Sequence, residues 1–409
     1  MDLSVACNWD KALIDGLWKH KEVASVFGKL GADKIGGGRA ASGIRDMSRL
    51  QAEKYIQYCQ EKGIKFHYLY NAACLGGMEF STEGRNHLLR ELDWAAGRAN
   101  VDAVIVSTNY LLKLTRKRYP KLKVILSVFL RVWKPEKLKY FEDLGVHEIT
   151  LGMYINRDFK LLEKLRKTVG CHLRLFVNQT CLFNCPNTSY HARFLGHASQ
   201  THNRSCHACV DYNCWTCIKR KLDEPEEILK SRWIRPEDIK IYEDMGYDRF
   251  KLTDRTRSSA WLIRAAEAYI NRSYGGDLVD ILALKIASDE QNSVPDVTRT
   301  FKRDLLKNCQ ADRVWLKGVF GWGKYGRPHI DNRKLDGYID FFRRAGVDCF
   351  LRDCSQCGWC KKWADKVISF KNEEAHQRLR MIIGQSVNEF LLGNLFAPDE
   401  RKKSRTIGI

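Results

Sequence analysis

Short apolar runs alternate with amphipathic stretches along the first 254 residues, and this alternation constrains the fold more than any other feature of the sequence. Short runs of apolar and β-branched residues, bounded by polar or glycine-containing segments, are typical of buried strands. The sequence predicts eight strands, at residues 3–7, 32–38, 65–71, 101–108, 123–129, 147–153, 172–178 and 249–254.

Helix-like stretches connect most of these strands. Apolar residues recur at helical spacing in residues 48–63, 84–99, 135–145 and 156–170, and Gly170 ends the last stretch. Eight strands with helices between them favour a (β/α)8 TIM-like barrel over an open doubly wound sheet. No G-x-G-x-x-G motif opens a helix after the first strand, which argues against a dinucleotide-binding domain.

The chain divides into two predicted regions. Residues 1–275 are expected to form the barrel, with a cysteine-rich loop at 181–217. Residues 276–409 are expected to form a mainly helical region that carries a second cysteine group at 349–360. A glycine- and aromatic-rich segment at 315–329 predicts a packed lid or a cover for the second cysteine group, and base stacking is the alternative.

The cysteine content points to metal chemistry once the compartment is considered. The chain has 409 residues and 15 cysteines, with no secretory signal and no apolar run long enough to span a membrane. The sequence therefore predicts a cytoplasmic protein. In a reducing cytosol, dense cysteines at short spacing are more often metal ligands or catalytic groups than disulfides.

Ten of the cysteines form two groups with ligand-like spacing. The first group reads C-x3-C and then C-x2-C-x4-C-x2-C, and the second reads C-x4-C-x2-C-x2-C. Zinc commonly takes two C-x2-C pairs, whereas a 4Fe–4S cluster commonly takes a tight C-x2-C-x2-C run plus one distant cysteine. The sequence predicts one 4Fe–4S cluster and a second centre that is either a cluster or zinc. The predicted ligands are Cys181, Cys185, Cys206, Cys209, Cys214, Cys217, Cys349, Cys354, Cys357 and Cys360.

The strongly basic charge leaves two interpretations open. The formal net charge is +20, from 69 Lys and Arg against 49 Asp and Glu. Basic runs occur at 111–123, 217–221 and 401–405. They indicate either an RNA or DNA partner held through phosphate contacts, or solvated helix faces that also balance anionic clusters and substrates.

Two segments resemble the U32 peptidase family, also called collagenase-like peptidases. LFVNQTCLFNCPNTSYHARFLGH (175–197) places a strand ending in Asn before C-x3-C-P and a spaced His. SRWIRPEDIKIYEDMGYDRFKLTDR (231–255) places an Ile-Arg-Pro-Glu-Asp helix start before a strand that leads to Lys and Arg. The cysteine group at 349–360 is similar to one found in the short branch of the family.

The resemblance implies a barrel with a cysteine-bound 4Fe–4S cluster, for which Cys181 and Cys185 match the cysteine pair of the family. Several members are oxygen-independent hydroxylases of ubiquinone precursors, transfer-RNA uridine or ribosomal-RNA cytidine, and prephenate is the implied oxygen source for some. The chain is therefore expected to be an oxidoreductase of this kind, acting on an RNA base or on a small aromatic or isoprenoid metabolite. Prephenate is the expected co-substrate, and an electron-donor protein or a related family member is the expected partner.

Polar residues near the predicted strand ends are the candidate site residues, because the loops after barrel strands form the reactive face. Asn178, His191 and His197 are predicted to be catalytic. The predicted substrate-binding residues are Arg39, Asn71, Lys251, Asp254 and Arg255, since paired Arg donors suit carboxylates such as those of prephenate. Structural roles stay open for all of them, as loop hydrogen bonds, a turn cap or salt-bridge scaffolding.

Two other functions stay open at this point. In a metal-stabilised RNA-binding protein, the metal would be structural and the basic surface would bind RNA. A protease is the other alternative, although the sequence contains neither H-E-x-x-H nor G-x-S-x-G. A Cys–His pair near His191 would compete with cluster ligation for the same thiols.

Overall fold

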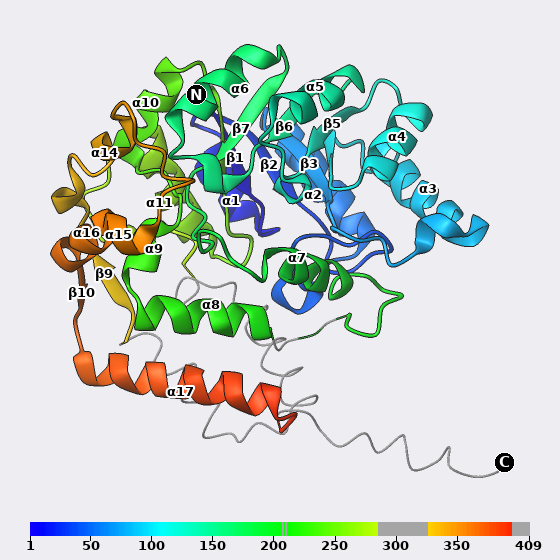
Figure 1. Cartoon of the computed structure of the whole chain (residues 1–409). Helices are drawn as coiled ribbons and strands as arrows, with labels where there is room; N and C mark the ends of the chain where they lie inside the picture. The colour runs from blue at the N-terminus through cyan, green and yellow to red at the C-terminus, as the bar shows by residue number, and fades with distance from the viewer. Residues whose placement is uncertain (207, 209–210, 285–325, 395–409) are drawn as a thin grey trace, which may run out of the picture.

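The main body of the protein is a closed barrel of eight parallel strands (Figure 1). The structure is a computed structural model that describes residues 1–206, 208, 211–284 and 326–394. Each strand pairs with the next in the sequence, and β8 pairs with β1 to close the barrel. The predicted (β/α)8 TIM-like barrel is therefore confirmed. The strands are β1 (Asp2–Ala6), β2 (Val23–Gly28), β3 (Lys65–Tyr70), β4 (Ala103–Val106), β5 (Lys123–Leu126), β6 (Glu148–Thr150), β7 (His172–Phe176) and β8 (Arg249–Leu252).

Helices that follow the strands form the outer layer of the barrel (Figure 1). In α6, for example, Phe159, Leu162 and Leu165 lie on one face at helical spacing and are buried. The outer helices are α1 (Lys11–Leu17), α2 (Arg49–Glu61), α3 (Thr82–Ala96), α4 (Asn109–Arg118), α5 (Pro135–Asp143), α6 (Phe159–Thr168), α10 (Ile239–Asp244) and α11 (Ser259–Ile270). Short 3-10 turns lie at Ala41–Gly43, Met78–Phe80, Val128–Leu130, Met153–Ile155, Pro236–Asp238, Leu278–Asp280 and Asn332–Leu335.

The second predicted strand, at 32–38, is wrong. The strand between β1 and β3 is Val23–Gly28, and residues 32–38 form part of the loop that follows it. Gly36 has a φ of 79°, a left-handed conformation that favours glycine and does not occur in a strand. The amide of Gly36 donates to the Asp33 carboxylate, and Asp33 itself pairs through its backbone only in an isolated bridge with Gln200.

A long excursion follows β7 and lies at the carboxyl end of the barrel. It contains α7 (Thr188–His197), α8 (Tyr212–Asp223) and α9 (Glu226–Lys230) before the chain returns through α10 to β8. Figure 1 shows α17 (Glu373–Leu391) running beside α8, and the contacts between the two helices agree. The rings of Tyr212 and Phe390 stack with centroids 5.3 Å apart, which fixes the end of α17 on the start of α8.

The described part of the C-terminal region is mainly helical, as predicted. It contains α14 (Asp340–Arg343), α15 (Cys354–Cys357), α16 (Trp359–Val367) and α17, with a small antiparallel sheet of β9 (Pro328–Ile330) and β10 (Ile368–Phe370). Helix α16 packs against α9, so this region is joined to the excursion after β7. Over the ranges that the structure describes, no helix is both long and apolar enough to cross a membrane.

Candidate active site

Asn178 joins the ends of β7 and β8 at the mouth of the barrel. Its side chain is fully buried, and its Oδ1 accepts a hydrogen bond from the Thr253 backbone amide at 2.8 Å. Its Nδ2 donates to the backbone oxygens of Thr253 and Ile281. Both ends of this predicted catalytic side chain are thus bound to backbone, which gives Asn178 a positioning role in the observed geometry.

Three of the predicted substrate-binding residues converge just after β8. Arg39 Nη2 lies 3.2 Å from Asp254 Oδ1, and the Asp254 side chain is almost completely buried. Arg255 is also buried, and burial together with the charge of Arg39 lowers the pKa of its guanidinium to about 10. Within the described residues, Nη1 of Arg255 has no hydrogen-bond partner. A buried guanidinium with a free donor suits a carboxylate or phosphate oxygen.

Asn71 supports the loop that carries Arg39. Its Oδ1 accepts from the Gly38 amide at 3.2 Å, and its Nδ2 donates to Ser127 Oγ at 3.3 Å. A β-carbon on Gly38 would lie 2.7 Å from the Phe129 ring, so this position requires glycine. The glycine run at 36–38 is therefore a close-packed support for Arg39.

Lys251 lies inside the barrel, where the charge of Arg255 also acts on it. Its Nζ lies 4.0 Å from the centre of the Phe27 ring, and the residue is 4% exposed. Burial and the nearby Arg174 lower the pKa of Lys251 well below its usual range. Arg174 itself forms a buried ion pair with Glu148, with Nη2 to Oε2 at 2.8 Å. Lys251 is consequently the substrate-binding prediction that lies deepest in the barrel.

Helix α8 presents two thiols to the loop that leaves β7. Cys214, Cys217 and Lys221 stand at i, i+3 and i+7, a spacing that places them on one face of the helix. Lys221 donates to the backbone oxygen of Thr180, so this face lies against the Cys181 loop. Asp211 caps the helix by accepting from the Cys214 amide at 3.1 Å.

Cys181 is the thiol of the first cysteine group on which the charge of Arg39 acts. Gln179 Nε2 donates to its Sγ at 3.2 Å. The pKa of the Cys181 thiol is raised, first by the surrounding protein and then by Cys217, although part of the residue reaches solvent. The charges of Arg39 and Lys221 oppose this shift. The first cysteine group and the predicted substrate-binding arginine therefore lie in one electrostatic environment.

The two predicted catalytic histidines lie on α7 in different surroundings. His191 Nε2 lies 2.8 Å from Asp211 Oδ2, and both side chains are partly exposed. Because Asp211 also caps α8, this pair ties α7 to the cysteine-bearing helix. His197 lies in the last turn of α7, and its Nε2 is buried without a hydrogen-bond partner in the described structure.

The second cysteine group surrounds buried cations. Arg232 Nη2 donates to Cys349 Sγ at 3.3 Å, and Tyr338 Oη lies 3.2 Å from Cys360 Sγ. Arg157 donates to Tyr338 Oη at 2.8 Å. Arg157 and Arg232 are each only 3% exposed. Buried positive charges of this kind favour anionic sulfur, because an unpaired buried charge is costly.

The cysteines form two neighbourhoods that suit a sulfur-bound group. In the described ranges, no three Cys, His, Asp or Glu side chains are arranged as a ready metal-binding set. The donor chemistry still fits a sulfur-bound group, because thiols are the usual ligands of such groups. The charge of Cys217 acts on the Cys181 thiol, and the charge of Cys349 acts on the thiols of Cys354 and Cys360. The residues that would hold a group at the mouth are Cys181, Cys185, Cys206, Cys214 and Cys217, and those at the second group are Cys349, Cys354, Cys357 and Cys360.

One predicted ligand, Cys209, lies outside the described residues. Its neighbour Ala208 is placed, because Ser42 Oγ donates to the Ala208 backbone oxygen at 3.0 Å. Outside the two groups, Cys7 and Cys59 are buried in the core. Burial raises the pKa of the Cys7 thiol to about 12, which makes it an unreactive packing residue.

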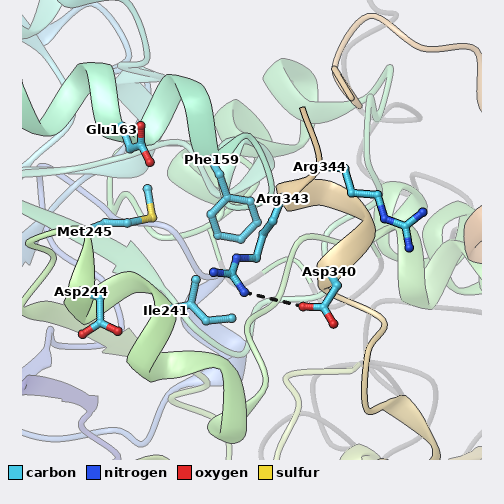
Figure 2. A pocket seen from close by; sticks show the side chains of 8 residues that line it. All are labelled: Phe159, Glu163, Ile241, Asp244, Met245, Asp340, Arg343 and Arg344. Atoms are coloured by element: carbon cyan, nitrogen blue, oxygen red, sulfur yellow. Dashed lines mark ion pairs between the residues drawn. The ribbon is translucent and has the colours of Figure 1, made fainter. Parts of the chain in front are cut away.

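A separate cavity of about 490 Å³ lies outside the barrel, between α6, α10 and α14 (Figure 2). Phe159, Ile241 and Met245 line it, together with charged side chains that include the Arg343–Asp340 ion pair at 3.6 Å. It contains none of the cysteines and none of the predicted site residues. The chemistry of the barrel mouth therefore lies elsewhere.

Several site residues escaped sequence analysis. Lys29 is buried and forms an ion pair with Asp33 at 3.0 Å beneath the glycine run. Arg157 and Arg232 contact the second cysteine group from positions far away in the sequence. Lys221 alone could have been predicted from the sequence, because its spacing from Cys214 and Cys217 places all three residues on one face of a helix.

The protein is a TIM-like barrel with charged groups and thiols at the carboxyl ends of its strands. The sequence profile of peptidase family U32 matches residues 21–276, and the chain belongs to this family. An uncharacterized protease of Methanocaldococcus jannaschii is 28% identical over 321 residues, covering 78% of this chain and 81% of the relative. A solved U32 peptidase is 21% identical and covers 62% of this chain and 93% of its own, with a TM-score of 0.47.

Proposed function

We propose that this chain is an iron–sulfur enzyme of the U32 family that performs an oxygen-independent hydroxylation or a related redox modification. The proposed substrate is an RNA base or a small aromatic or isoprenoid metabolite bound at the barrel mouth. The observation that carries the proposal is that Arg39 pairs with the buried Asp254, next to the buried Arg255, and that its charge also acts on the Cys181 thiol. A 4Fe–4S cluster on these thiols would supply one-electron chemistry beside an anion-binding site.

The charges at the mouth support a carboxylate co-substrate, with prephenate as the candidate. Arg255 offers a buried donor without a partner, and Asp254 orients Arg39 from a buried position. Asn178 fixes the β7 and β8 ends that carry the Cys181 loop and Arg255. This division leaves Arg255 to bind the carboxylate, Arg39 to complete the positive face, and Asn178 to hold the geometry.

The net charge of +20 supports an RNA substrate, since phosphate contacts would use Lys and Arg without base readout. A metabolite substrate would use the same mouth and leave the basic surface unoccupied. Binding of a transfer RNA and of a metabolite can be compared at two salt concentrations, because only the RNA interaction weakens steeply with salt.

Peptide hydrolysis is the second candidate, favoured by the names of the family and of its relative. A thiol protease needs a base within hydrogen-bond reach of its nucleophile. Here His191 pairs with Asp211, and the donor to Cys181 is Gln179. These contacts favour the redox proposal over a Cys–His nucleophile.

The test is an anaerobic assay of reconstituted protein with prephenate, dithionite and either total RNA or a mixture of quinone precursors, read by mass spectrometry. The expected product carries one additional oxygen and requires prephenate. Arg255→Lys is expected to raise the KM for prephenate, because a single ammonium replaces the paired donors. Cleavage of a peptide library with no oxygen added to any nucleoside or metabolite would contradict the proposal.

A further inference from the structure

Arg232 lies in a segment that runs beside the chain leaving β7. The backbone amide of Ile234 donates to the Val177 oxygen at 2.7 Å, and Ser231 Oγ donates to the Thr180 oxygen at 3.2 Å. This segment connects α9, which packs on α16 of the second cysteine group, with the helix start at Pro236–Asp238. The position of Arg232 between the two cysteine groups is thus set by backbone hydrogen bonds.

The Arg232 side chain contacts the loop of the first cysteine group and a thiol of the second. Its guanidinium lies 4.0 Å above the centre of the Phe183 ring, and Phe183 stands between Cys181 and Cys185 in the sequence. Its Nη2 donates to Cys349 Sγ at 3.3 Å. One buried guanidinium therefore stacks on the first cysteine loop and hydrogen-bonds a thiol of the second group.

One further contact joins the loops of the two cysteine groups at this point. The rings of Phe183 and Phe350 meet edge to face with centroids 6.1 Å apart, and Phe350 is the residue after Cys349. The Nη1 of Arg232 is buried and has no hydrogen-bond partner among the described residues. An anionic sulfur centre on either side would satisfy this donor, because thiolate and sulfide sulfurs accept hydrogen bonds.

We propose that Arg232 couples the two cysteine groups into one redox unit. The inference rests on the proposed function, since it requires a cluster at each group. Reduction adds one negative charge to a cluster, and the shared guanidinium stabilises that charge at both sites. An electron that passes between the groups oxidises one centre and reduces the other by one electron, and no atom or proton is transferred. Arg232 is a positioning residue, because it contacts cluster ligands and their loop without contacting substrate.

The first test uses the wild-type protein and needs no variant. Reconstituted full-length protein is reduced stepwise with dithionite under anaerobic conditions and followed by electron paramagnetic resonance. The expected result is a simple spectrum at partial reduction and a broadened, interacting spectrum at full reduction, because two nearby paramagnets couple. Two clusters that give independent signals at every stage would overturn the proposal.

The second test measures the reduction potential of each centre in Arg232→Gln, Arg232→Lys and Arg272→Gln. Loss of the charge in Arg232→Gln is expected to disfavour reduction of the second group by at least tenfold, which is about 59 mV for one electron. Arg232→Lys keeps the charge and should recover most of this shift. Arg272 pairs with Glu243 at 2.8 Å on the surface, so Arg272→Gln is the matched control and should leave both potentials unchanged. Unchanged potentials in Arg232→Gln would overturn the proposal.

The outcomes separate this inference from the proposed function. Protein that binds no iron and no sulfide contradicts both. A single cluster with prephenate-dependent activity retains the proposed function and overturns the coupling. Two clusters that bind normally but show no interaction and no response to Arg232 variants likewise overturn the coupling alone.

Discussion

The two cysteine groups differ in how the protein surrounds them. At the barrel mouth, Cys181 is exposed and accepts a hydrogen bond from the neutral amide of Gln179. In the second group, Cys349 accepts from the buried guanidinium of Arg232, and Cys360 lies beside Tyr338. The mouth group is thus open on one side, whereas the second group is held by buried charged and phenolic donors.

This difference indicates a division of roles. An exposed thiol environment beside Arg39 and Arg255 is suited to contact with a substrate. A centre among buried cations is suited to holding negative charge, because hydrogen bonds and positive charge near sulfur raise its reduction potential. The comparison teaches that similar cysteine spacing can serve two functions, and that the surrounding residues decide which.

The largest expected effect comes from removing thiols one group at a time. Cys181→Ser/Cys217→Ser and Cys354→Ser/Cys360→Ser should each lose about four irons per chain, the content of one 4Fe–4S cluster. The other group should stay filled in each variant, since the ligands come from separate segments. Iron and acid-labile sulfide analysis checks this. Loss of all iron in either variant would show that the two groups form one site.

Removing Arg157 should be the most destabilising single change at the second group. Its guanidinium donates to the backbone oxygens of Leu229 and Ser231 and to Tyr338 Oη. Arg157→Met would remove these three buried hydrogen bonds, although the Leu229 oxygen would keep its bond from Tyr338 Oη, and should lower the free energy of unfolding by about 3 kcal/mol. Urea denaturation measures this loss.

The control for that change is Arg39→Met at the barrel mouth. The Arg39 side chain is 19% exposed, and its ion pair with Asp254 is partly replaced by Arg257 at 4.0 Å. The expected loss is about 1 kcal/mol. Equal losses in the two variants would contradict the contrast between the partly exposed arginine of the mouth and the buried arginines beside the second group.

Asp238 should make the stability of the region behind the second group depend on pH. Burial raises the pKa of its carboxyl to about 6, partly opposed by Arg235. The protonated Asp238 carboxyl contributes to the free energy of unfolding. This contribution is fully present below the pKa of the unfolded state, near 4, and is lost as the pH rises through about 6. The loss should be about 3 kcal/mol. In Asp238→Asn, the free energy of unfolding from urea denaturation should differ less between pH 4 and pH 7 than in the wild type. An unchanged pH dependence would contradict the assignment to Asp238.

The smallest effect on stability is expected for His191. Its pair with Asp211 is partly exposed, so His191→Ala should cost less than about 1 kcal/mol and leave the iron content unchanged. The same variant tests its predicted catalytic role. A loss of about 100-fold in kcat at unchanged iron content supports proton transfer by His191. An unchanged kcat would mean that the His191–Asp211 pair only joins α7 to α8.

The sequence predicted the barrel well because strand and helix periodicities are local. It placed the second strand at 32–38 because Ile35 and the glycine run resemble a strand and its exit. The true strand, Val23–Gly28, is specified by pairing with β1 and β3. The amides of the glycine run instead bind side chains such as Asn71 and Ser199, which are distant in the sequence.

Cysteine spacing similarly predicted two groups but not their surroundings. Arg232 acts on a thiol 117 residues away, and no local pattern signals such a contact. Arg157 comes from the start of the α6 segment, where the sequence indicates only a helix. Positions with local periodicity are therefore predictable, whereas buried charges are defined by tertiary contacts.

The most direct test of the account is the metal content of the wild-type protein purified without oxygen. Iron, acid-labile sulfide and zinc are measured, and the visible absorption is recorded before and after dithionite. The account predicts about eight irons and eight sulfides per chain, with a brown absorption band that dithionite bleaches. Zinc without sulfide at both groups would contradict it and would make the cysteines structural.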